Sequence, residues 1–234
     1  MISKGELTSV SVGVVIPAAG QGKRMGTKES KQFLLFHQKP ILLHTLDVFE
    51  FHPEIDEIVV VVRENEIERT QKLIDMQGYK KVCKIVAGGR ERQESVFLGL
   101  KDLSTDLVLV HDAVRPFVTE KAVTRLISEI RVYDAAILAV PVKDTVKKVD
   151  ESNVLETLER RQLWAVQTPQ GFRRELLVEA HTQAEKEADF ATDDAALVEK
   201  LGINVRVVDG EYTNIKITTP EDLLFAEAIY RMKG

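Results

Sequence analysis

The sequence has one cysteine, one tryptophan, no excess of positive charge and no long apolar run. Cys83 has no second cysteine for an intrachain disulfide, which favours a reducing compartment, and within VCKIV we expect an ordinary strand residue. With 32 lysines and arginines against 37 aspartates and glutamates, the net charge is −5. Nonspecific binding to nucleic acid or a membrane surface needs a basic excess, so neither partner is expected.

Long hydrophobic segments are missing as well. No stretch approaches the ~20 apolar residues of a membrane span, and residues 1–10 lack the apolar core of a signal peptide. The sequence therefore predicts a soluble, cytoplasmic protein. Its 234 residues, 44% hydrophobic and 29% charged, are typical of a single globular domain, here residues 1–234, with a sizeable core.

Apolar runs of strand length alternate with segments of helical period along most of the chain. Residues 10–16 and 57–62 have the pattern of buried strands, and residues 40–50 have helical spacing. Further strands are expected at 82–86, 107–113, 135–142 and 204–208, and helices from Thr119, Arg173, Thr192 and Thr219. Strands that are apolar nearly throughout indicate a parallel sheet covered by helices on both faces. We predict a doubly wound α/β fold with a mostly parallel, Rossmann-like sheet.

The alternation of strand segments with helical segments stops over residues 143–167. Short alternating stretches there flank the turn-like DESN, which predicts a protruding β-hairpin arm. A two-stranded hairpin alone is marginal in water, so the arm should lie on another surface. A second subunit is the natural candidate.

The stretch PAAGQGKRM, residues 17–25, follows the first predicted strand. Gly20 and Gly22 would let backbone N–H groups approach a phosphate, at the strand end where open α/β sheets bind ligands. The positive charge that a polyphosphate needs would come from Lys23, Arg24 and either Lys28 or Lys31. The alternative is a tight turn whose basic residues face solvent.

Two common nucleotide motifs do not fit this stretch. Met25 stands where the dinucleotide fingerprint has its third glycine, and the strand at 57–62 runs into Arg63 and Glu64 without a distinctive ribose-binding acid. The P-loop pattern G-x-x-x-x-G-K-[ST] is absent. A mononucleotide triphosphate is therefore favoured over NAD or a P-loop ATPase.

Eight motifs follow one another along residues 12–230: PAAGQGKRM, KQF, GGRERQESV, HDAVRPF, PVKDTVK, LWAVQTPQGF, TDDAALVE and NIKITTPEDL. Through them the sequence resembles the 2-C-methyl-D-erythritol 4-phosphate cytidylyltransferases, nucleotidyltransferases of the non-mevalonate isoprenoid pathway. The resemblance implies transfer of CMP from CTP to methylerythritol phosphate, giving 4-diphosphocytidyl-2-C-methyl-D-erythritol and pyrophosphate. It also implies Mg²⁺ and a homodimer clasped by exchanged β-arms.

The residue types suit this chemistry. The attacking phosphate oxygen is already anionic near neutral pH, so no general base is needed. Catalysis of such a transfer rests on positioning and on cations that stabilise the charge of the α-phosphate during in-line displacement.

The resemblance also implies residue roles. The catalytic cations would be Arg24, Lys31, Arg160 and Lys216, with Arg160 reaching into the partner's site. CTP contacts would come from Ala18, Ala19, Gly20, Gln21, Gly22, Gly89, Ser95 and Asp112. Contacts with methylerythritol phosphate would come from Asp112, Arg115, Thr145, Arg160, Thr168 and Lys216. Mg²⁺ would be held mainly by CTP phosphates, with Asp112 as the candidate protein ligand. Arg90 stands where relatives can have an acid, and its role is open.

Structural readings compete with these roles. The pair His111-Asp112 can be a solvated strand end, Arg160 and Lys216 can be surface residues, and no histidine has zinc-type spacing. Asp193-Asp194 is expected mainly to complement a helix dipole, and Trp164 to anchor the arm or an interface.

Three other functions compete with methylerythritol phosphate cytidylyltransfer. A ribitol 5-phosphate cytidylyltransferase of teichoic acid synthesis shares the glycine stretch, KQF and TPQ. A nucleotide-sugar transferase would normally carry an Asp-x-Asp pair, which this chain lacks. A non-catalytic nucleotide sensor would bind CTP without releasing pyrophosphate.

Overall fold

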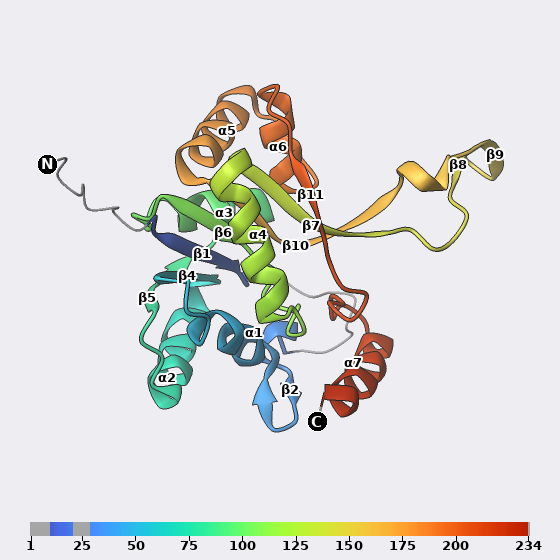
Figure 1. Ribbon diagram of the computed structural model, residues 1–234. Helices are drawn as coiled ribbons and strands as arrows, with labels where there is room; N and C mark the ends of the chain where they lie inside the picture. Colours follow the sequence, from blue (N-terminus) through green and yellow to red (C-terminus); the bar gives the residue numbers. More distant parts are fainter. Residues whose placement is uncertain (1–9, 21–28, 234) are drawn as a thin grey trace, which may run out of the picture.

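The computed structural model describes residues 10–20 and 29–233 (Figure 1). The central strands are β1 (Val12–Pro17), β4 (Glu57–Val62), β5 (Val82–Ala87), β6 (Leu107–Val110), β7 (Ala135–Pro141), β10 (Trp164–Arg173) and β11 (Arg206–Asp209). They form one seven-stranded sheet in the order β11-β7-β10-β6-β1-β4-β5. In this sheet β10 is antiparallel to its neighbours β6 and β7, and the other pairings are parallel. The prediction of a mostly parallel α/β sheet is confirmed.

Helices cover both faces of this sheet, because its strands are apolar on both sides. The helices are α1 (Ile41–Glu50), α2 (Ile67–Gln77), α3 (Arg92–Leu100), α4 (Glu120–Tyr133), α5 (Arg174–Glu187), α6 (Asp194–Lys200) and α7 (Pro220–Lys233). In β1, Val12, Val14 and Ile16 pack in the core cluster formed with α1, α2 and α4. Val15 points the other way, into the cluster formed with α3, α5 and α6.

Helix α3 lies unusually close to the sheet at Gly99. A Cβ atom there would be 2.6 Å from Cγ1 of Val15 and 2.9 Å from Cγ2 of Val61. A larger side chain would push the helix away. This packing holds the last turn of α3 against the sheet, and the first turns of the same helix carry Arg92 and Ser95.

The helices begin where the sequence predicts them, with a different capping residue at α6. The helix predicted from Thr119 is α4, and Thr119 caps it, since its Oγ1 accepts a hydrogen bond from an N–H in the first turn. Helix α6 is capped by Asp193 and not by Thr192, because the Asp193 carboxylate reaches that helix's first turn. In α7 the Asp222 carboxylate accepts from the N–H groups of Thr218 and Thr219.

The predicted arm is present and projects from the body (Figure 1). Strands β8 (Lys147–Asp150) and β9 (Asn153–Thr157) form a separate two-stranded antiparallel sheet in which every residue is exposed. A short 3₁₀ turn, η4 (Arg160–Gln162), follows. The predicted end at residue 167 is too late, because Trp164 already pairs with Pro141 in the central sheet.

Smaller features complete the fold. Strands β2 (Leu35–Phe36) and β3 (Lys39–Pro40) form a hairpin, and Phe36 packs in a third cluster with Ile229 of α7. Two further 3₁₀ turns are η2 (Lys31–Phe33) and η3 (Glu64–Glu66). Cys83 lies in β5 as predicted and is exposed. Across the described ranges, none of the helices is long and apolar enough to cross a membrane.

Candidate active site

A pocket of about 140 Å³ opens at the carboxyl ends of β1, β5 and β6, the position expected for a ligand in an open α/β sheet. Its lining brings together segments far apart in sequence: Pro17, Ala18, Ala19, Gly20, Lys31, Gln32, Gly89, Arg90, Glu91, Arg92, Ser95, Asp112, Ala113, Val114 and Lys216. Most residues predicted to bind CTP therefore line one cavity.

Side chains from neighbouring elements hold the first part of the glycine stretch. Arg63 donates from Nε to the carbonyl of Ala19 and from Nη2 to that of Gly20, both at 3.2 Å. Gln32 Nε2 donates to the carbonyl of Ala18 at 2.6 Å. Three carbonyls in a row are thus engaged by protein donors, which fixes the backbone path. Sequence reasoning did not single out Arg63 or Gln32.

The predicted residues Gln21, Gly22 and Arg24 lie outside the described ranges, as do Lys23 and Lys28. The roles assigned to them stay predictions. Lys31, by contrast, is described, begins the turn η2 and lines the pocket.

The opposite wall is the turn between β5 and α3. Ser95 Oγ accepts from the N–H of Gly89 at 3.1 Å and donates to the carbonyl of Glu91 at 3.0 Å. Its only hydroxyl hydrogen is therefore used to fold the turn. A Cβ on Gly88 would lie 2.6 Å from Cβ of Ala19, so the two walls touch where this glycine stands.

Asp112, which follows β6, is the centre of a charged cluster. Its carboxylate lies 2.8 Å from Lys216 Nζ, 3.3 Å from Arg92 Nε and 3.4 Å from Arg115 Nε. Burial alone would raise the pKa of Asp112, but the three cations outweigh burial and hold this pKa well below its ordinary value. Asp112 is only 6% exposed, which contradicts the reading of a solvated strand end. Arg92 was not anticipated from the sequence.

His111 and Thr168 are hydrogen-bonded to the backbone of this cluster. His111 is fully buried, and burial lowers its pKa to about 4, so the ring is neutral at pH 7. Its Nε2 lies 3.0 Å from the carbonyl of Arg115, which can only accept, so Nε2 carries the hydrogen. The Thr168 hydroxyl therefore donates to Nδ1, at 3.2 Å, and accepts from the N–H of Asp112 at 3.0 Å.

A second pocket, of about 220 Å³, adjoins the first. It is lined by Arg92, Asp112, Arg115, Val166, Gln167, Thr168, Gln170, Thr192, Asp193 and Lys216. The two pockets share Arg92, Asp112 and Lys216 as a common wall. Two ligands bound side by side would meet at these three residues.

Comparison with known proteins identifies the family. The family model IspD, 2-C-methyl-D-erythritol 4-phosphate cytidylyltransferase, matches residues 12–232. The chain belongs to this family. A protein of that name from Halalkalibacterium halodurans is 57% identical over 221 residues, which cover 94% of this chain and 97% of the relative. One from Alkaliphilus metalliredigens is 51% identical over 226 residues, covering 95% and 94%.

Solved structures agree with this assignment. The 4-diphosphocytidyl-2C-methyl-D-erythritol synthase from Anaerococcus prevotii has a TM-score of 0.84 at 36% identity, covering 95% of this chain and 96% of that one. The cytidylyltransferase from Thermus thermophilus has a TM-score of 0.77 at 36% identity, covering 94% and 99%. The resemblance seen in the motifs is confirmed: the chain is a nucleotidyltransferase of the cytidylyltransferase family, and the ribitol phosphate alternative is not favoured.

Two acidic residues at the start of α6 have different roles in this cytidylyltransferase. Asp193 caps the helix and accepts from Gln170 Nε2 at 2.7 Å. Asp194 was expected mainly to complement the helix dipole, but it is 1% exposed and accepts from Arg92 Nη1 at 2.7 Å. Its other carboxylate oxygen lies 3.2 Å from His181 Nε2. The sequence TDDAALVE gives no signal that distinguishes the buried acid from the capping one.

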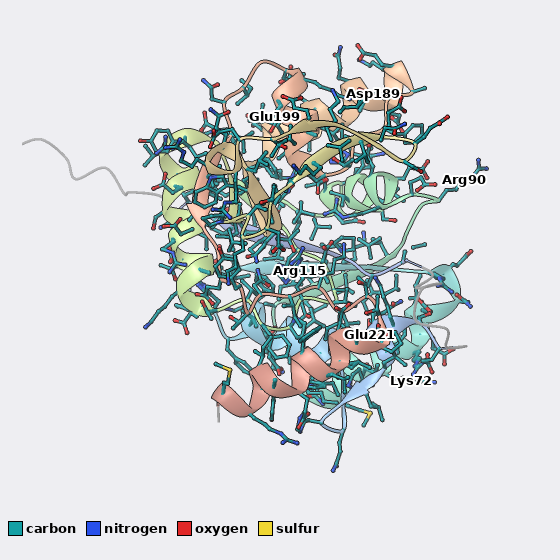
Figure 2. All side chains as sticks on the ribbon, turned by 90° about the vertical axis from the view of Figure 1, so that its right-hand side faces the viewer. Lys72, Arg90, Arg115, Asp189, Glu199 and Glu221 are labelled. Carbon is teal, nitrogen blue, oxygen red and sulfur yellow. The ribbon has the colours of Figure 1, made fainter. Side chains whose placement is uncertain are left out.

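Two predicted substrate residues stand apart from both pockets within one chain. Thr145 and Arg160 are exposed residues of the described arm and line neither pocket, and Arg160 donates to the carbonyl of Lys143 at 2.8 Å. In Figure 2 Arg115 lies at the centre of the view, while Arg90 points outward at its edge. Arg90 is exposed, and it also borders the first pocket.

Proposed function

We propose that this member of the cytidylyltransferase family binds CTP in the first pocket and methylerythritol phosphate in the second. The observation that carries this assignment is the common wall of the two pockets, because the reaction must join a phosphate of one ligand to the α-phosphate of the other. CMP is then transferred and pyrophosphate leaves from the first pocket.

Lys216 and Asp112 would act together at that wall. Lys216 lies 2.8 Å from the Asp112 carboxylate, which fixes its ammonium at the meeting point of the ligands. The ammonium can hold the attacking phosphate oxygen in line with the α-phosphate. Arg115 faces only the second pocket and offers a second cation to the substrate phosphate. Lys31 faces only the first pocket, where the triphosphate charge lies.

Mg²⁺ fits this site as an ion held mainly by its substrate. Within the described ranges there is no cluster of three or more candidate metal ligands. Mg²⁺ commonly keeps several waters and binds through phosphates with one or two carboxylates. Asp112, the carboxylate that lines both pockets among the described residues, would be the protein contact. The ion would supply positive charge to the phosphates of CTP.

We also propose a homodimer through the arms. Val149, Val154 and Leu155 are 58%, 60% and 59% exposed on an arm that projects from its own chain. Such a hairpin gains stability only when another surface covers it. An exchanged arm would bring Thr145 and Arg160 to the partner's second pocket, which explains their distance from the site in one chain.

The activity assay is pyrophosphate release with CTP and Mg²⁺, given methylerythritol phosphate or ribitol 5-phosphate in parallel. We expect release with methylerythritol phosphate alone. The Lys216→Ala variant should lose about 100-fold in kcat, and Lys72→Ala, on the exposed face of α2, should be unchanged. Release only with ribitol 5-phosphate would overturn the substrate, and release with neither would overturn the activity.

A further inference from the structure

We propose that Arg92 is a further catalytic residue, a cation that contacts the phosphoryl group as it is transferred. This inference rests on the proposed function. Among the described residues, the cations that line both pockets are Arg92 and Lys216. Lys31 lines only the first pocket and Arg115 only the second. Because the reacting atoms must lie where the ligands meet, Arg92 has the same access to them as Lys216.

The guanidinium of Arg92 keeps N–H donors that its two carboxylate partners do not use. Nε donates to Asp112 at 3.3 Å and Nη1 to Asp194 at 2.7 Å. Neither of these bonds uses Nη2, and the side chain is 31% exposed. An arginine has five N–H donors in a fixed plane, so an anion can bind while both carboxylates stay in place.

The two carboxylates hold the guanidinium before a substrate arrives. Asp194 is buried, and His181 on α5 lies against its second oxygen. Asp112 sits on the opposite side of Arg92, at the end of β6. A donor fixed in this way need not be reoriented when charge develops on the phosphoryl group, which is the condition for electrostatic catalysis.

The charge of the wall also favours an anion. The connected cluster holds three cations, Arg92, Arg115 and Lys216, against two carboxylates, Asp112 and Asp194. Where the two pockets meet, the common wall holds two of these cations, Arg92 and Lys216, against one carboxylate, Asp112. A phosphoryl group in transfer would neutralise this excess, whereas an ion pair with only a structural purpose would need no such surplus.

The competing interpretation is a purely structural pair that ties α3 to α6. A double-mutant cycle distinguishes the structural interpretation from the catalytic one. Arg92→Met removes the charge but keeps the apolar stem, and leaves Asp194 buried without its cation, so stability falls. In the double variant Arg92→Met/Asp194→Asn both charges are absent, so much of that stability should return. If Arg92 contacts the phosphoryl group, kcat stays low in both.

The experiment measures kcat by pyrophosphate release and thermal stability for the wild type and the cycle. We expect kcat to fall about 100-fold in Arg92→Met and equally in the double variant, although the latter is the more stable. Asp194→Asn alone should lower kcat less, because Asp194 positions Arg92 and does not touch the substrate. Recovery of kcat in the double variant would overturn the proposal.

Two further variants control the result. Arg92→Lys keeps a positive charge and should retain more kcat than Arg92→Met; equal values would also overturn the proposal. The pair Arg173–Asp134, at 2.7 Å and outside both pockets, provides the matched control. Arg173→Met/Asp134→Asn should keep wild-type kcat. Wild-type release of pyrophosphate tests the proposed function separately, before any variant is compared.

Discussion

His111 shows how one buried side chain can organise a charged site without carrying charge itself. It hydrogen-bonds the carbonyl of Arg115 and the hydroxyl of Thr168, which in turn holds the N–H of Asp112. A protonated ring would be a donor at both nitrogens and would conflict with the Thr168 hydroxyl hydrogen. The neutral form is therefore part of the folded arrangement.

This residue should make stability depend on pH. Burial lowers the pKa of His111 from 6.5 to about 4. Between these two pH values the unfolded chain binds a proton at this residue and the folded chain does not. The contribution of the neutral His111 ring to the free energy of unfolding is fully present above pH 6.5, and it is lost as the pH falls towards 4. Between pH 7 and pH 5 the loss should be roughly 2 kcal/mol of the free energy of unfolding.

Urea unfolding at pH 7 and pH 5 measures this loss. Burial also lowers the pKa values of His44 and His52, which act in the same direction, so the comparison is with a variant. His111→Gln keeps a donor and an acceptor but does not titrate, and its pH dependence should be smaller by that amount. The same slope in both proteins would contradict the prediction.

The sequence predicted some residues of the site and missed others for a physical reason. Asp112 and Lys216 lie in distinctive motifs, and the fold brings the Asp112 carboxylate within 2.8 Å of Lys216 Nζ, which lies between β11 and α7. Arg92 shares the segment GGRERQESV with Arg90, and composition cannot tell which arginine faces the pocket. The close packing of α3 on the sheet decides this, and it depends on residues remote in sequence.

At the scale of elements, the junction before α7 connects the site to the C-terminal helix. The carboxylate of Asp222 accepts from the N–H of Thr218 at 2.7 Å and of Thr219 at 2.8 Å, just after Lys216. It also accepts from the Thr218 hydroxyl at 3.0 Å. These bonds satisfy donors that the start of a helix leaves free.

Asp222→Ala should therefore lower the free energy of unfolding by about 1 kcal/mol. Asp222→Asn keeps an acceptor oxygen at the same place and should retain most of that stability. Urea unfolding of the three proteins at pH 7 gives the comparison. An equal loss in both variants would show that the negative charge matters and the hydrogen bonds do not.

The boundary of the arm shows what a local pattern cannot reveal. The alternation over residues 143–167 correctly predicts a hairpin, but β10 begins at Trp164 and enters the centre of the sheet. Its neighbours β6 and β7 are fixed by pairings such as Gly171 with Leu109 and Ala136. Such register depends on contacts between distant segments, which no local window contains.

At the scale of the molecule, the proposed dimer makes each site depend on two chains. Arg160→Ala and Lys216→Ala should each be nearly inactive. When the two are mixed and allowed to exchange subunits, a mixed dimer has one complete site, with Lys216 from one chain and Arg160 from the other. Activity should return to about a quarter of the wild-type value, since half of the dimers are mixed.

A mixture of Lys31→Ala and Lys216→Ala is the matched control. Both residues line pockets of the same chain, so no site in a mixed dimer would be complete. Recovery in the first mixture and not in the second is the expected result. Equal behaviour of the two mixtures would contradict the exchange of arms.

The position of β10 also has a consequence for synthesis of the chain. Strands β1, β4, β5 and β6 are neighbours, and all have been made once residue 110 is added. Strand β7, which ends at Pro141, lies between β10 and β11 in the sheet, and both of these strands are made later. At ~5–20 residues per second, the ribosome needs roughly 2–6 s more to reach Arg173. For an interval of this length, between the emergence of β7 and that of β10 from the ribosome, a nascent chain carries an apolar strand without a partner. Emergence of β10 ends this exposure, and the arm is made between the two strands.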